Sequence, residues 1–515
     1  MSQSLFKSAS LVSIMTLISR ILGFVRDLIA AQIFGATAAV DSFYIAFKIP
    51  NFMRNLFAEG AFSQAFVPVL SEYKEKRSKQ DTQKFISHIT ASLGIILIII
   101  TILGVFGASG LIHLFAPGLD SLRFDLSTEM LRITFPYLML ISLTALGGAI
   151  LNTYGIFGIP AITPALLNIC LIATAFGITH YFAVPVVAQA WGVLIAGFVQ
   201  LFFQFSALHR IGFLVRPQFR AHDEGVKRVL KLMVPAIFGA SVAQINILLN
   251  TIFASFLTIG SVTWLYYSER LAYFPLGVFG VALATVILPH LSREHAVNSK
   301  NGFADALDWG IRCNLIISFP ATLAMLILSG PLIVSLFAYG KFSTHDVLMT
   351  QQSVIAYAIG LPAFMLIKVL SSAFYAKLDI RTPVKITVIS LVINVILSMV
   401  LLKPLAHAGL ALASSLSSWT NVCILLLVLY KRKIYLPSRN FFRFIIQLLF
   451  ANGITSIFLI YFSSTTITWI SWSWYQRLFH VLILGVGAIM IYFVSLWAGK
   501  MKWREFIITK EIASS

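Results

Sequence analysis

The sequence predicts an all-α polytopic membrane protein with about fourteen transmembrane helices. The first observation behind this fold class is composition: of 515 residues, 58% are hydrophobic and 11% are charged, and the mean hydropathy is +0.89. A soluble domain is about 25% charged, so a soluble fold is excluded. The second observation is the length of the apolar runs, and the third is the placement of lysine and arginine between them.

Apolar runs bounded by glycine, proline or charged clusters define the expected spans, since a bilayer crossing takes about 20 apolar residues. The spans are expected at residues 8–31, 40–70, 84–113, 128–152, 160–180, 184–208, 228–257, 262–291, 304–337, 347–374, 383–402, 405–430, 441–463 and 476–499. An arginine pair, Arg20 and Arg26, follows the first apolar run without a convincing cleavage site, so an uncleaved helix is expected rather than a signal peptide.

Lysine and arginine are concentrated in every second loop, and this asymmetry predicts which side of the membrane each loop faces. Of the 38 such residues, most fall in loops on one side of the expected membrane. The other side receives only Arg123, Lys341, Lys403 and Arg477. Because cytoplasmic loops carry the excess of positive charge, both termini are expected in the cytoplasm. The same placement explains the net charge of +19 without a nucleic-acid partner.

An internal repeat of about 220 residues relates the first six spans to the next six. "AFVPVLSEYKE" and "TVILPHLSREH" align Pro68 with Pro289, and "GIPAITPALLN" corresponds in order to "DIRTPVKITVI". Six spans per copy make the repeats parallel, with their interface as the expected site. We therefore expect an N-lobe at 1–222, a C-lobe at 223–436 and an additional helix pair at 437–515.

Several charged side chains fall at membrane depth, where a charge costs a few kcal/mol and is by default a functional hypothesis. The basic members are Arg20, Arg26, Lys48, Arg54, Arg270 and Lys368, and the acidic members are Asp27, Asp41, Glu59 and Glu269. Helix positions seven or eleven apart lie on nearly the same face, so Arg20 shares a face with Asp27, and Asp41 with Lys48 and Glu59. The alternative is that these residues only pair with one another and hold helices together.

The surplus of positive charge in this set indicates an anionic ligand. The planar guanidinium matches phosphate oxygens in a bidentate manner, and such contacts are strong in a low-dielectric cavity. A phosphate or diphosphate is therefore the expected ligand. A cation-coupled multidrug exporter would instead need an acidic, aromatic cavity, and the arginine surplus argues against that function.

No enzyme signature is found in the sequence. The ten histidines are scattered without ligand spacing, and the three cysteines, Cys170, Cys313 and Cys423, lie in apolar runs. A membrane enzyme that transfers phosphosugars onto polyprenyl phosphate would need clustered acids for a metal, or a catalytic histidine, near one membrane face. We expect no enzyme activity, no cofactor and no metal. A basic scaffold protein is a further alternative, but it would not need the charged residues that are expected at membrane depth.

Five motifs carry a family resemblance that covers almost the whole chain. They are "SRILGFVRD", "DSFYIAFKIPNFMRNLFAEGAFSQAFVPVLSEYKE", "NTIFASFL", "YYSERLAYFPLGVFGVAL" and "LSGPLIVSLFAYGKF". The sequence resembles the MurJ (MviN) family of lipid II flippases, within the multidrug/oligosaccharidyl-lipid/polysaccharide exporter superfamily. This resemblance implies two six-helix lobes around a central cationic cavity, and two C-terminal helices that form a groove for the lipid tail.

The resemblance also implies a function and a site. The implied function is translocation of lipid II, an undecaprenyl-diphosphate-linked peptidoglycan precursor, to the periplasmic leaflet of the bacterial inner membrane by alternating access. Substrate binding is implied for Arg20, Arg26, Arg54 and Arg270, and supporting cavity charges are Asp27, Asp41, Lys48, Glu59 and Glu269. A flippase for another polyprenyl-linked glycan has the same electrostatics and stays an open alternative.

The chain departs from the family pattern at Tyr273, where some members have an acid. Some members also bind sodium through carboxylates in spans seven and eleven, but neither span contains Asp or Glu here, so no sodium site is expected. The expected partners are lipid II and membrane lipids. Proteins of cell-wall synthesis are candidate partners of the basic cytoplasmic loops, and the protein is expected to be monomeric.

Overall fold

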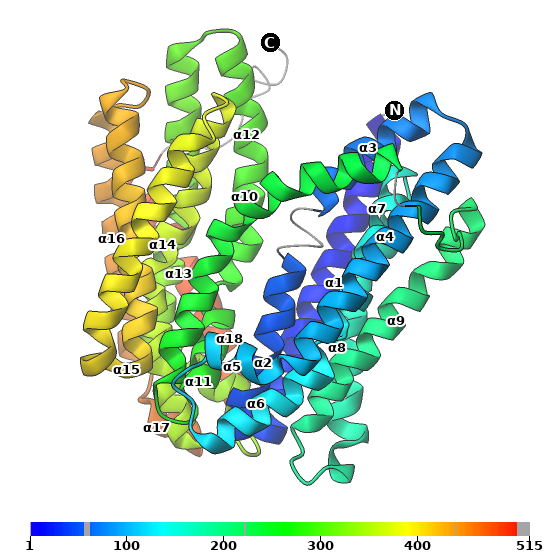
Figure 1. Cartoon of the computed structure of the whole chain (residues 1–515). Helices are drawn as coiled ribbons and strands as arrows, with labels where there is room; N and C mark the ends of the chain where they lie inside the picture. Colours follow the sequence, from blue (N-terminus) through cyan, green and yellow to red (C-terminus); the bar gives the residue numbers. More distant parts are fainter. Residues whose placement is uncertain (1, 56–61, 221–222, 438, 502–515) are drawn as a thin grey trace. The chain divides into compact units, whose positions relative to one another are not determined.

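The fold is all-helical in a computed structural model, which describes residues 2–55, 62–220, 223–437 and 439–501 (Figure 1). No strand occurs within these ranges. Two compact units are formed, residues 1–263 and residues 264–515. This division follows contacts within the structure, and the lobe boundaries expected from the repeat stay predictions.

Unit 1 contains the helices of the first seven expected spans. They are α1 (Ser2–Phe34), α2 (Ala38–Arg54), α3 (Ser63–Lys76), α4 (Lys79–Phe106), α5 (Ala108–Phe115), α6 (Ser121–Thr134), α7 (Tyr137–Thr153), α8 (Gly158–Gly177), α9 (Val187–Ile211) and α10 (Glu224–Ser255). Helix α1 packs on α8, α2 packs on α6, and α9 packs on α7 and α8. Phe66, Phe85 and Val229 belong to one buried core cluster, which explains why α10 groups with this unit.

Unit 2 contains the remaining helices. They are α11 (Ser261–Ala272, which begins at the unit boundary), η3 (Leu276–Gly280), α12 (Val281–Ala296), α13 (Lys300–Phe337), α14 (Thr344–Ala376), α15 (Arg381–Lys431), α16 (Arg439–Phe462), α17 (Thr466–Ser471) and α18 (Trp474–Ala498). Helix α14 packs on α13 and α15, whereas α16 and α18 pack on each other and on α13. A buried cluster that includes Leu307, Val369, Leu425 and Leu448 forms the core.

Ten helices among the described residues are long and apolar enough to cross a membrane. The total of fourteen spans stays a prediction. Two of the expected spans, 383–402 and 405–430, form the single element α15. Ala406 lies inside α15 with φ 46° and ψ −128°, which breaks the helical path between its two halves. Pro404 precedes this break, and a proline inside a helix removes one backbone hydrogen bond.

Two of the expected spans contain π-helical geometry. Span two contains α2 and α3, and both Asn55 and Phe62, on either side of residues 56–61, are π-helical. In the alignment that pairs Pro68 with Pro289, residue 55 corresponds to residue 276, where the π-helical turn η3 begins. The two spans therefore have π-helical geometry at corresponding positions, and the repeat itself stays a prediction.

Arg477 fastens the terminal helix α18 to α13 in unit 2. Its side chain is 7% exposed and donates to the carbonyl oxygens of Trp469 at 3.0 Å and Ile470 at 2.7 Å. It also donates to the carbonyls of Val334 and Ala338, at 3.3 and 3.2 Å, where α13 ends. The charge thus adds hydrogen bonds to carbonyls at the ends of α17 and α13.

Replacement of this residue, Arg477→Ala, is predicted to destabilise the protein by about 3 kcal/mol, because it leaves buried carbonyls without a donor. The measurement is thermal unfolding in detergent, with Lys341→Ala as the control, since Lys341 is exposed on the turn after α13. Equal melting temperatures for the two variants would show that Arg477 does not fasten α18.

Candidate functional site

Arg26 and Asp27 form a buried ion pair on α1. The Arg26 side chain donates to one Asp27 oxygen through Nε at 3.0 Å and Nη2 at 2.6 Å. Its Nη1 donates to the side-chain oxygen of Asn168 on α8 at 3.0 Å. Asn168 in turn donates to the backbone carbonyl of Ser19 at 3.1 Å. With Arg26 9% exposed, these contacts hold its guanidinium in one orientation at the α1–α8 contact.

Asp41 is fully buried in the first turn of α2. One carboxylate oxygen accepts from the Gly260 backbone N–H at 2.7 Å. The other accepts from the backbone N–H and the hydroxyl of Thr263, at 2.9 and 2.6 Å. The carboxylate therefore ties the start of α2 to the segment that follows α10, across 222 residues of sequence.

Arg123 supports this contact from α6. Its Nη1 lies 3.9 Å from the Asp41 carboxylate, and its Nε is 2.6 Å from Asp120. A hydrogen bond from the backbone N–H of Arg123 is the main cause that lowers the pKa of the Asp120 carboxyl. The alternative reading, in which membrane-depth charges hold helices together, therefore describes the contacts of Asp41 well.

The remaining basic candidates of unit 1 are more accessible. Arg20 is exposed on α1, and Lys48 on α2 is half-buried. Arg54, also half-buried, donates through Nε and Nη2 to the Asn51 side chain, at 3.0 and 2.8 Å. Glu59 lies outside the described residues. Arg20 and Asp27 were expected on one helix face, and α1 contains both; one oxygen of the Asp27 carboxylate binds the adjacent Arg26 at 2.6 Å.

Glu269 and Arg270 lie near the end of α11 in unit 2. Arg270 is exposed and donates through Nη2 to the Tyr266 hydroxyl at 3.0 Å, with its guanidinium carbon 5.0 Å from the centre of that ring. Glu269 is half-buried, and Lys368 on α14 is exposed. The Arg270 guanidinium therefore combines a contact with an aromatic ring and a hydrogen bond to the hydroxyl of the same residue.

Three contacts of this site were not predicted from the sequence. They involve Asn168, Arg123 and Thr263, each of which binds a predicted charge. The sequence does mark Asn168, because it is a polar residue within the apolar run of the repeat motif "GIPAITPALLN". It marks Arg123 less clearly, because Arg123 follows Asp120 at the spacing of an N-terminal helix cap.

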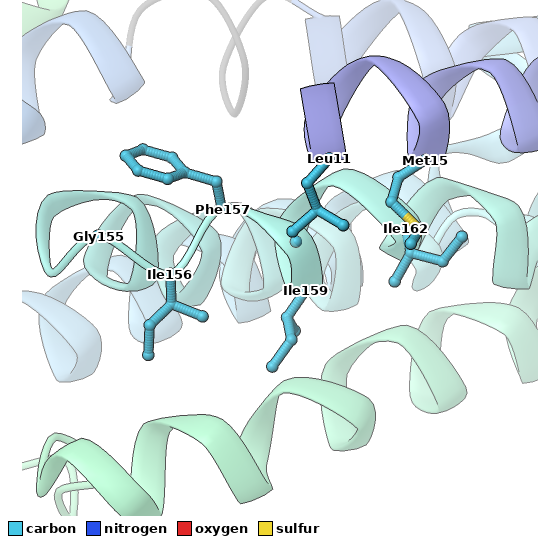
Figure 2. A pocket seen from close by; sticks show the side chains of 8 residues that line it. Leu11, Met15, Gly155, Ile156, Phe157, Ile159 and Ile162 are labelled. Carbon is cyan, nitrogen blue, oxygen red and sulfur yellow. The ribbon is translucent and has the colours of Figure 1, made fainter. Parts of the chain in front are cut away.

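An apolar pocket lies between α1 and the start of α8 (Figure 2). Its volume is about 530 Å³, and its lining side chains include Leu11, Met15, Ile156, Phe157 and Ile162. None of its lining residues is charged, so this pocket is not suited to an anion. Within the part of the chain that is described, no group of three His, Cys, Asp or Glu residues could hold a metal ion.

The replacement Asp41→Asn is predicted to lower the free energy of unfolding by about 2 kcal/mol. The amide keeps the side-chain shape but places an NH₂ group against backbone donors of Gly260 or Thr263. Thermal unfolding measures the effect, and Asp125→Asn is the matched control because Asp125 is exposed on α6. If both variants unfold at the same temperature, the buried contacts of Asp41 contribute no stability.

Comparisons with known proteins agree on one family. A family model described as lipid II flippase MurJ matches residues 30–480. A protein of Vibrio cholerae serotype O1 named probable lipid II flippase MurJ is 43% identical over 496 residues, which is 94% of each chain. The lipid II flippase MurJ of Burkholderia cenocepacia is 41% identical over 451 residues, covering 86% of this chain and 87% of that one.

A solved structure of the same family also aligns with this chain over nearly its whole length. A lipid II flippase MurJ in an inward closed conformation aligns with a TM-score of 0.79 at 29% identity, covering 96% of this chain and 99% of that one. An inward-facing multidrug resistance transporter of the MATE family aligns with a TM-score of 0.68 at 14% identity, covering 82% and 98%, which supports the fold alone. The chain therefore belongs to the MurJ family of lipid II flippases.

Proposed function

We propose that this protein carries lipid II from the cytoplasmic to the periplasmic leaflet of the bacterial inner membrane by alternating access. The observation that carries the proposal is family membership over nearly the whole chain, and it is supported by arginines in both units that the sequence predicts at membrane depth. On this proposal the substrate-binding residues are Arg20, Arg26, Arg54 and Arg270, and both termini lie in the cytoplasm.

The diphosphate is the part of lipid II that these arginines suit. Arg20 and Arg270 are exposed at membrane depth, and Arg26 is held in place by Asp27 and Asn168. Guanidinium groups bind phosphate oxygens through paired charge-assisted hydrogen bonds, which are about twice as strong as neutral ones. A cationic drug would be repelled by the same groups, so the multidrug-exporter alternative is disfavoured.

The undecaprenyl tail is assigned to the C-terminal helix pair. Large apolar side chains are exposed along both helices; they include Phe442, Ile446, Leu449 and Phe450 on α16, and Leu482, Val486, Ile489 and Phe493 on α18. Such a surface suits contact with hydrocarbon rather than water. The proposed organisation is an N-lobe at 1–222, a C-lobe at 223–436 and the tail-binding pair at 437–515.

Transport then needs a substrate that favours one arrangement of the lobes over another. A ligand shifts a conformational equilibrium only through its differential affinity for the two states. Neutralisation of the arginine charge by the diphosphate supplies such a difference, because like charges repel strongly in a medium of low dielectric constant. Substrate binding would thus favour closure of the inward-facing state.

The function is tested by depleting the protein in its host and adding a membrane-impermeant hydrolase that cleaves lipid II from outside. We expect the cleavable fraction to fall sharply while the precursor accumulates inside. An unchanged cleavable fraction, in a host whose other flippases have been removed, would contradict lipid II as the substrate. Other polyprenyl-linked glycans would then be assayed in the same way.

The site is tested with Arg26→Ala and Arg270→Ala, each predicted to weaken lipid II binding about tenfold or more through loss of charge-assisted hydrogen bonds. Binding is measured on purified protein in lipid nanodiscs. Arg210→Ala is the matched control, because Arg210 is exposed at the end of α9. Arg26→Lys separates charge from geometry, since lysine cannot reproduce the three contacts of Arg26. Wild-type binding by both alanine variants would refute the arginine site.

A further inference from the structure

A cluster of polar groups adjoins Arg270 within unit 2. It consists of the Glu269 carboxylate and the phenol hydroxyls of Tyr273 and Tyr357. The backbone N–H of Tyr273 donates to the backbone carbonyl of Glu269 at 2.9 Å, and the ring centre of Tyr273 lies 5.9 Å from that of Tyr357. Tyr273 follows Glu269 by one helical turn at the end of α11, and Tyr357 comes from α14, so two elements build the cluster.

Aromatic packing fixes the two phenol rings. The ring centre of Tyr273 lies 5.9 Å from that of Tyr357 and 5.1 Å from that of Phe364, in edge-to-face geometry. Tyr357 is only 5% exposed. The faces of these rings are thus used in packing, so a ligand meets the hydroxyl groups rather than a flat aromatic surface.

The polar side-chain atoms of the cluster can still form hydrogen bonds. Within the described ranges, no hydrogen bond is found to the Glu269 carboxylate or to either phenol oxygen. The buried polar atoms that are sealed from solvent and lack a partner do not include them. Each therefore keeps some accessible surface and unused hydrogen-bonding capacity, a combination typical of a site that completes its hydrogen bonds with a ligand.

The position of the cluster relative to Arg270 indicates which part of a ligand it meets. Tyr266, Glu269, Arg270 and Tyr273 follow the i, i+3, i+4, i+7 spacing of one helix face. The Tyr266 hydroxyl accepts a hydrogen bond from Arg270 at one end of this face, and the cluster lies at the other end. A ligand whose phosphate contacts Arg270 would present the group attached to that phosphate to the cluster.

The chemistry of the cluster suits hydroxyl and amide groups. A carboxylate accepts hydrogen bonds from sugar hydroxyls, and a phenol both donates and accepts. With Tyr273 where some family members have an acid, one carboxylate stands beside two neutral phenols and a guanidinium. This balance of charge favours a neutral polyol over a cation. The first sugar of a polyprenyl-diphosphate glycan carries such groups next to the diphosphate.

We propose that Glu269, Tyr273 and Tyr357 form a saccharide subsite, which binds the sugar attached to the diphosphate and so contributes specificity for the glycan. This inference rests on the proposed function, because it takes the diphosphate to be bound at Arg270. It assigns Tyr273 and Tyr357 to substrate recognition and gives Glu269 the role of a hydrogen-bond acceptor for the sugar.

The experiment compares two probes on full-length protein in nanodiscs: lipid II, which carries the saccharide, and undecaprenyl diphosphate, which lacks it. The Glu269→Gln variant and the double variant Tyr273→Phe, Tyr357→Phe should each bind lipid II about tenfold more weakly, through lost hydrogen bonds. Their affinity for undecaprenyl diphosphate should equal that of the wild type. Tyr267→Phe, whose ring packs against Phe337 and Phe342, is the control and should leave the ratio of the two affinities unchanged.

Three outcomes overturn the subsite: unchanged binding of lipid II by the variants, an equal loss for both probes, or equal affinity of the wild-type protein for the two probes. An equal loss would mean that the cluster acts only by positioning Arg270. Failure of the wild-type protein to bind lipid II would instead refute the proposed function, so the two hypotheses fail in different ways.

Discussion

The Arg26 guanidinium, held between Asp27 and Asn168, illustrates the constraint on which this structure depends. A charge buried among helices is stable only when its hydrogen bonds are satisfied by other groups of the protein or by a ligand. Arg26 uses a carboxylate and an amide for this purpose, Asp41 uses backbone and hydroxyl donors, and Arg477 uses four carbonyls. The surrounding helices pack so that these partners meet.

This constraint separates two kinds of charge. Asp41 and Arg477 are enclosed and have their hydrogen bonds within the chain, so their removal should affect stability first. Arg20 and Arg270 are exposed, and at the membrane depth that the sequence predicts for them a positive charge is costly unless water or an anion reaches it. A transporter for a diphosphate needs both kinds, because a rigid frame positions the few groups that change partners during the cycle.

The sequence predicted the helices better than the contacts. Long apolar runs determined the class and most of the helices, since twenty apolar residues in a row have few alternatives to a membrane helix. The contact between Asp41 and Thr263 could not be predicted, because it joins residues 222 positions apart and depends on how the helices pack. Helical phase places Arg20 and Asp27 on one face of α1, but it does not predict that the adjacent Arg26 binds the Asp27 carboxylate. The Tyr273–Tyr357 packing needs α11 and α14 to meet, which no local pattern encodes.

Unit 2 contains both Arg270 and the C-terminal helix pair, and this has a consequence for the proposed transport. Arg477 joins α18 to the end of α13, and Tyr435 donates to Asp308 on α13 at 2.6 Å from the segment just before α16. The pair is therefore attached to α13 near both ends of that helix. If the tail lies along α16 and α18, then the tail, the Arg270 contact and the proposed saccharide subsite all belong to one unit. The substrate contacts proposed for this unit would then not have to change relative to one another during transport.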